Sequence, residues 1–168
     1  KLYICRKSFR MTVSAFLKNA NTPWKMRLYM LLRLPGAWFM GMNIQSCNLE
    51  QAVVRLPYRW RSKNPFRSIY FAAQCAAAEL STGMLVLAHL QEKPPVSMLV
   101  VGFEASFYKK AGETLLFTCT EGAEIGQVIQ RAVETGEGQE FVAHSVGRLP
   151  DGTVAAEMKV KWSFKKKK

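Results

Sequence analysis

The sequence predicts an α+β domain in which six antiparallel strands wrap around one long helix. Its 168 residues and 49% hydrophobic content suit one well-packed core, so we expect a single domain over residues 1–168. A run of small residues in the middle of the chain predicts the helix, and alternating apolar and polar residues predict the strands. Residues 1–22 are expected to form an N-terminal extension and residues 165–168 a basic tail.

The first predicted element is a helix over Pro23 to Leu34. Thr22 is suited to cap its start, Pro23 suits its first position, and Pro35-Gly36 ends it. Leu28, Leu31 and Leu32 fall at helical spacing within it. The apolar segment Ala37–Met40 that follows is expected to cover the core or line an apolar pocket.

Two strands and the central helix come next. Residues 41–47 and 49–57 are predicted strands, the second with a drier face of Ala52, Val54 and Leu56. The segment Ser68 to Leu87 is rich in alanine and predicts the central helix. A helix this thin can be enclosed by a curved sheet, although helix propensity alone would also explain the alanines.

The remainder of the chain predicts four strands and a short helix. Residues 96–109 and 113–121 are predicted strands separated by Lys110-Ala111-Gly112, which is a hairpin signal. A short helix over 123–134 is expected between strands four and five. Strands over 140–148 and 153–164 then flank a tight turn at Leu149–Gly152. The last strand alternates most clearly, with one apolar face formed by Met158, Val160, Trp162 and Phe164.

Charge is distributed unevenly along the chain. Residues 1–67 hold 13 Lys and Arg against the single acid Glu50, residues 68–164 have a net charge of −4, and the terminal lysines add +4. This asymmetry suggests an anionic partner such as a phosphorylated ligand or lipid headgroups, and a solvated surface explains it equally well. Nucleic acid is not expected, because no phosphate-binding loop, RNA-binding signature or reading helix accompanies the charge.

The sequence predicts no metal site, no disulfide framework and no membrane-spanning helix. Cys5, Cys47, Cys75 and Cys119 are scattered without a CxxC pair, which predicts no metal site and reduced thiols in the cytoplasm. The longest charge-free run near the start, Leu34–Leu49, is shorter than the roughly 20 apolar residues that a membrane span requires. The first ten residues lack the pattern of a secretory signal.

One stretch resembles a known family. In Asn64-Pro-Phe-Arg-Ser-Ile-Tyr-Phe-Ala-Ala-Gln-Cys-Ala-Ala-Ala-Glu79, an Asn is followed after six residues by an aromatic residue and after nine more by an acid. This arrangement resembles the hotdog-fold acyl-CoA thioesterases of the phenylacetate-pathway type, in which a His-Gly-Gly opens the helix. Here Tyr70 stands in place of the His and Phe71-Ala72 in place of Gly-Gly. The similarity spans Leu28 to Phe164 and points to a thioesterase-like branch of the superfamily.

The resemblance implies hydrolysis of a medium- or long-chain acyl-CoA. Glu79 would act as general base or nucleophile, the amides of Phe71 and Ala72 would bind the oxyanion, Asn64 would orient water or substrate, and the Tyr70 hydroxyl could donate a hydrogen bond. The lone carboxylate of Glu79 among small apolar residues independently suggests a raised pKa, although a half-exposed helix carboxylate is the ordinary interpretation.

The resemblance also implies the partners. CoA would be bound as part of the substrate, and no other cofactor is expected. Its phosphates would be contacted by Arg59, Arg61, Lys63, Arg67, Lys109 and Lys110. A homodimer, or a tetramer built from it, would place the sites at the subunit interface. Contact with a membrane surface through the basic helix is the less favoured alternative.

Two other functions are weighed against hydrolysis. Side chains at Tyr70 and Phe71, where the family has His and Gly, favour an alternative in which the protein binds acyl groups without catalysis. A hotdog dehydratase is discounted, because neither His89 nor His144 lies on or just before the start of the predicted central helix.

Overall fold

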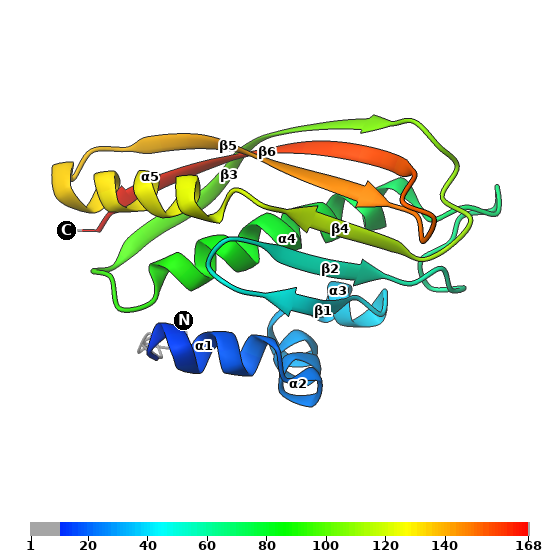
Figure 1. Cartoon of the computed structure of the whole chain (residues 1–168), viewed down its shortest axis with the longest axis horizontal. Coiled ribbons are helices and arrows are strands. Elements are labelled where there is room, and N and C mark those ends of the chain that lie inside the picture. The colour runs from blue at the N-terminus through cyan, green and yellow to red at the C-terminus, as the bar shows by residue number, and fades with distance from the viewer. Residues whose placement is uncertain (1–10, 168) are drawn as a thin grey trace, which may run out of the picture.

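The computed structural model describes residues 11–167 and has one six-stranded antiparallel sheet over a long helix (Figure 1). The order of strands in the sheet is β1-β2-β4-β5-β6-β3, and every pair is antiparallel. The elements are α1 (Val13–Ala20), α2 (Pro23–Arg33), α3 (Pro35–Phe39), β1 (Asn43–Cys47), β2 (Ala52–Leu56), α4 (Phe71–Leu90), β3 (Val96–Phe107), β4 (Leu115–Cys119), α5 (Gly122–Thr135), β5 (Gln139–Arg148) and β6 (Val154–Lys166). The predicted α+β class and its central helix are confirmed.

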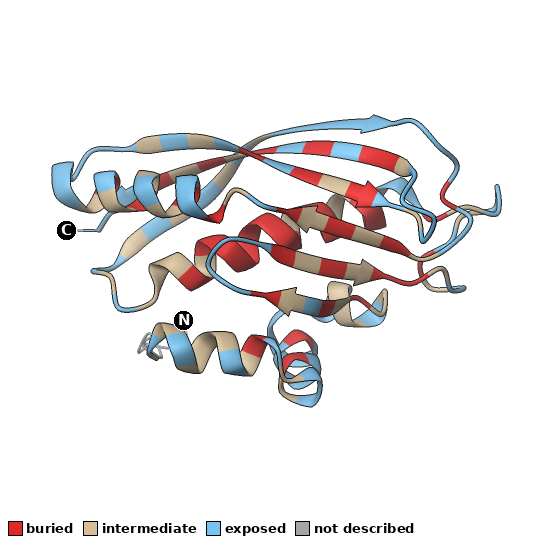
Figure 2. Cartoon of the chain, viewed as in Figure 1, coloured by how far each residue is buried: buried red, intermediate tan, exposed pale blue. Residues whose placement is uncertain are grey.

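Helix α4 forms the centre of the core. It is long and apolar enough to cross a membrane by length and composition, but 67% of that stretch is buried within the domain (Figure 2). Its alanines allow the sheet to approach closely, and Ala77 and Ala78 are fully buried beside large core residues such as Phe117 and Phe164. The apolar face predicted for the last strand is buried throughout.

The start of α4 lies three residues later than predicted, at Phe71 instead of Ser68. The preceding segment is extended, because the amide of Ile69 donates to the carbonyl of Ala111 and the amide of Tyr70 donates to that of Ser62. These long-range bonds hold Ile69 and Tyr70 out of the helix.

The hairpin predicted at Lys110-Ala111-Gly112 is wrong. Strand β3 pairs with β6 at one edge of the sheet, whereas β4 pairs with β2 and β5. The turn signal correctly marks a change of chain direction, but it carries no information about which strands become neighbours.

Both predicted flanking segments contain regular structure. Helix α1 lies within the expected N-terminal extension, where the side chain of Thr12 accepts a hydrogen bond from the amide of Ala15. Helix α3 begins at Pro35, the residue predicted to end α2. Strand β6 continues through Lys165 and Lys166, which pair with Ser97 and Val96, so the first two residues of the predicted basic tail belong to the sheet. Cys5 lies outside the described residues.

Candidate active site at the start of the central helix

The loop before α4 is fixed by Asn64. Its side-chain oxygen Oδ1 accepts hydrogen bonds from the amides of Phe66 and Ser68 at 3.0 and 3.2 Å and from the Ser68 hydroxyl at 3.2 Å. Asn64 therefore performs the turn-forming role common for this residue type. Its Nδ2 group donates no hydrogen bond within residues 11–167 and is available to a ligand.

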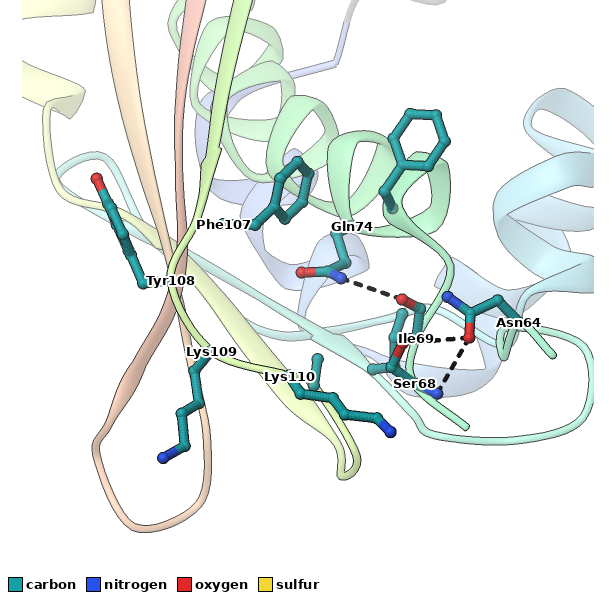
Figure 3. A pocket seen from close by; sticks show the side chains of 10 residues that line it. Asn64, Ser68, Ile69, Gln74, Phe107, Tyr108, Lys109 and Lys110 are labelled. Carbon is teal, nitrogen blue, oxygen red and sulfur yellow. Dashed lines mark hydrogen bonds between the residues drawn. The ribbon is translucent and has the colours of Figure 1, made fainter. Parts of the chain in front are cut away.

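A cleft of about 330 Å³ opens between this loop, the first turn of α4 and the end of β3 (Figure 3). Its walls combine aromatic rings with cationic and amide groups. The lining residues are Asn64, Ser68, Ile69, Phe71, Gln74, Phe107, Tyr108, Lys109, Lys110 and Ala111.

Gln74 is a polar residue of this cleft that the sequence did not single out. It is 6% exposed, and its Nε2 donates to the carbonyl of Ile69 at 3.1 Å, which fixes the orientation of the amide. Its Oε1 has no hydrogen-bond partner within the described chain and points toward the β3 side of the cleft (Figure 3). A buried carbonyl oxygen without a donor is unfavourable, so this atom is suited to accept a bond from a ligand.

The first two amides of α4 are also available. In residues 11–167, the amides of Phe71 and Ala72 donate to no backbone acceptor, whereas those of Ala73 and Gln74 bond to the carbonyl of Tyr70. Free amides at a helix start stabilise negative charge through their own dipoles and the helix dipole. They can therefore donate hydrogen bonds to an oxyanion, which is the role that the family resemblance implies for them.

The side chains of Tyr70 and Phe71 stand close to these amides. The two rings are 47% and 55% exposed and meet edge to face with centroids 5.0 Å apart. Phe71 also meets Phe107 of β3 edge to face at 6.4 Å. Both rings therefore border the approach to the start of the helix.

Glu79 lies more than two helical turns further along α4 and does not line the cleft. Burial raises the pKa of its carboxyl above the ordinary glutamate value, and no ion pair within residues 11–167 involves it. Its Oε1 lies 3.5 Å from the position that a Cβ on Gly83 would occupy, and the Trp162 ring lies 3.6 Å from the same point. The carboxyl therefore lies on the side of α4 that faces Trp162 of β6.

Strand β3 leaves an apolar surface uncovered beside β6. Phe103, Ala105 and Phe107 are directly opposite Val160, Met158 and Ala156 of β6 and share their inward face. The β6 residues are buried, whereas Phe103 and Phe107 are 39% and 45% exposed. We name the surface formed by Phe103, Ala105 and Phe107 the β3 floor. In a single chain, this surface is open to a ligand or to a second chain.

The structure separates the predicted cations into two groups. Lys109 and Lys110 line the cleft, whereas Arg59, Arg61, Lys63 and Arg67 lie on the adjoining loop outside its lining. The guanidinium of Arg61 lies over the ring of Phe39 in α3 at 5.7 Å.

The thiols are poor candidates for a nucleophile. Burial raises the pKa of Cys47 and of Cys119 to about 11, and it also raises the pKa of Cys75, which precedes Glu79 by one turn of α4. A thiol that stays protonated at neutral pH is a weak nucleophile.

Comparison with solved structures supports the fold assignment. A Chlorobaculum tepidum protein of unknown function aligns with a TM-score of 0.74 at 13% identity, covering 91% of this chain and 99% of its own. The Pseudomonas aeruginosa protein PA5026, described as a probable thioesterase, aligns with a TM-score of 0.70 at 18% identity, covering 85% of this chain and 95% of its own. The Staphylococcus aureus thioesterase SAV0944 aligns with a TM-score of 0.56 at 15% identity, covering 77% and 97%.

Sequence comparison gives the family. No curated protein matches the chain at a significant level. The model of the family described as "Domain of unknown function (DUF4442)" matches residues 22–164, which is most of the chain and includes the loop, the cleft and all of α4. With its six antiparallel strands around one helix, the chain has the hotdog fold and belongs to the DUF4442 family.

Proposed function

We propose that the protein is a thioesterase that hydrolyses a medium- or long-chain acyl-CoA. The observation that carries this proposal is the position of Glu79 on the central helix of a hotdog fold, as a partly buried carboxyl that forms no ion pair within residues 11–167. A carboxyl with a raised pKa is suited to accept a proton from water near neutral pH. The thioesterase names of structures with this fold give independent support.

The distances along α4 lead us to propose a site shared between two protomers. Phe71 and Glu79 are eight residues apart on the same helix, which is about 12 Å at 1.5 Å per residue. A substrate carbonyl bound to the amide of Phe71 is therefore too far from the Glu79 carboxyl of the same chain for both groups to act on it. In a homodimer, the start of one α4 can be placed beside Glu79 of the other.

Edge strand β3 is the proposed dimer contact. It is 12 residues long, lies at the end of the sheet and exposes Leu99, Val101, Phe103 and Phe107. Long apolar edge strands favour pairing with another strand. Pairing of two β3 strands would make one continuous sheet and would bring the two β3 floors together beneath the acyl chain.

The spacing of the candidate residues gives a further point of support. Structures of the Staphylococcus aureus protein have alanine in place of one glutamate and, separately, in place of one glutamine that precedes it by 15 residues. Asn64 likewise precedes Glu79 by 15 residues. This equal spacing supports a functional role for the pair in our chain.

Binding of acyl groups without catalysis is the second candidate function. The rings of Tyr70 and Phe71 border the free amides and favour it, since they restrict the approach of a carbonyl to them. Released CoA measured with a thiol-reactive dye, over a panel of acyl-CoA chain lengths, distinguishes the two functions. We expect turnover on medium or long chains; tight binding with no turnover on any chain length would favour the carrier.

Lys109 and Lys110 are the proposed contacts to the CoA phosphates. Replacing both by glutamine should weaken CoA binding by about tenfold and reduce its salt dependence, because two charge-assisted contacts are lost. Calorimetry at two salt concentrations measures both effects. The matched variant is Arg59→Gln with Lys63→Gln on the adjoining loop, and a larger effect there would transfer the phosphate contact to the loop.

Gln74 is proposed to accept a hydrogen bond from an amide of the pantetheine arm when the exposed Phe107 ring beside it rotates. Gln74→Met keeps the volume and removes the acceptor, so KM should rise by about five- to tenfold with kcat little changed. The melting temperature should change little, because an unpaired buried oxygen and the bond to Ile69 are lost together. A fall in melting temperature with unchanged KM would show that Gln74 is only structural.

A further inference from the structure

Helix α2 directs its most apolar side away from the protein. Met26 and Met30 are its buried residues and face the core. At about 100° per residue, the opposite side of the helix is centred on Leu28. The exposed apolar residues of that side are Trp24 (67%), Leu28 (49%), Leu31 (43%) and Leu32 (68%). Surface helices usually have the reverse arrangement, with polar residues toward solvent.

Cations flank this apolar side and acids are absent from it. By the same helical angles, Arg27 lies along one border of the apolar side and Lys25 along the other, while Arg33 is exposed at the last position of the helix. Glu50 is the only acid among the first 78 residues, and it lies outside α2, α3 and the loop before α4. The surface therefore combines exposed tryptophan and leucine with positive charge alone.

Exposed apolar residues and cations are also found in the neighbouring segments. Helix α3 follows α2 after Leu34, and its Phe39, 48% exposed, meets the ring of Trp60 edge to face at 6.0 Å. Trp60 and Phe66 are 71% and 77% exposed on the loop that also has Arg59, Arg61, Lys63 and Arg67. Figure 2 shows pale blue along much of α2 and at the tip of this loop.

We propose that this surface, defined by the outward side of α2 with Phe39, Trp60 and Phe66, binds the surface of an anionic membrane. Aromatic and leucine side chains enter the boundary between headgroups and acyl chains, while Lys and Arg contact anionic headgroups. An acidic lipid surface matches both the charge and the apolar residues. The inference goes beyond the proposed hydrolysis and is independent of Glu79 and the cleft.

Flotation with phosphatidylcholine vesicles, with and without phosphatidylglycerol, tests the proposal on the full chain. We expect binding only to the vesicles containing phosphatidylglycerol, weakened by salt. Replacing Trp24, Leu28 and Leu31 together by serine should reduce it at least about tenfold, because the inserted apolar area is lost. Circular dichroism checks the fold, which we expect to be kept because Met26 and Met30 are unchanged.

Two further variants separate the contributions. Lys25→Gln, Arg27→Gln and Arg33→Gln together should remove the preference for phosphatidylglycerol, whereas Val142→Ser on the outer face of β5 should leave binding unchanged. Absence of binding to both vesicle types, or equal binding by the α2 serine variant, would overturn the proposal. Light scattering that shows a smaller oligomer for the serine variant would overturn it in favour of contact between copies.

Discussion

Glu79→Gln is expected to lower kcat for acyl-CoA hydrolysis by roughly 10²- to 10⁴-fold, because the amide cannot accept the proton of the attacking water. Binding of acyl-CoA should be largely retained, since glutamine has the shape of glutamate. In the wild type, kcat should increase as pH rises through the raised pKa of Glu79, because the ionised form is the base. Steady-state kinetics over a range of pH measure both effects.

The stability of the same variant is a control on this interpretation. Burial raises the folded-state pKa of Glu79 above its unfolded value, so the ionised carboxyl destabilises the folded protein as pH rises between these two values. Glutamine removes that effect, and the melting temperature at neutral pH should stay the same or rise. Glu124→Gln, at an exposed position of α5, is the matched control for catalysis. An active wild type whose Glu79→Gln variant is equally fast would exclude the proposed role.

Phe71→Pro is expected to lower kcat by roughly 10²- to 10³-fold, because it removes one N–H donor from the proposed oxyanion site. Phe71 is the first residue of α4, where proline is tolerated, and Tyr70 has φ −59° and ψ 132°, the extended conformation that precedes proline readily. The helix should therefore form normally, which circular dichroism and the melting temperature can verify.

Phe71→Ala is the matched variant for the side chain. It removes the exposed ring but keeps the amide, so it should retain turnover or increase it by opening the approach to the helix start. Equal losses in the proline and alanine variants would assign the effect to the ring and would remove the amide of Phe71 from the mechanism.

Local sequence patterns predicted the helices and strands of the fold better than they predicted which strands lie side by side. Alternation in β2 and β6 correctly predicted which side chains are buried, because one face of each strand lies against α4. The pairing of β3 with β6 could not be read from the turn at Lys110-Ala111-Gly112, because it joins residues that are 49 to 70 positions apart along the chain. The spacing of Leu28, Leu31 and Leu32 predicted helix α2. The structure buries Met26 and Met30 instead of these leucines, because tertiary packing decides which side of the helix faces the core.

The candidate site was predictable from the sequence only for the residues that belong to one motif. Asn64, Phe71 and Glu79 were predicted from the resemblance of one stretch to a known family, but the cleft that Asn64 and Phe71 line without Glu79 appears only in the structure. Gln74 gave no signal beyond being polar within an alanine run. Its importance depends on the carbonyl of Ile69, which an extended segment brings into reach of its side chain.

The central claim is hydrolysis at a site to which both protomers contribute, and mixing two inactive variants tests it directly. Glu79→Gln and Phe71→Pro subunits, co-expressed in equal amounts, form mixed dimers in which one site has both substitutions and the other has neither. Random pairing makes half of the dimers mixed, so about a quarter of the wild-type acyl-CoA hydrolysis should return. Activity no higher than that of the two variants measured separately would contradict the shared site.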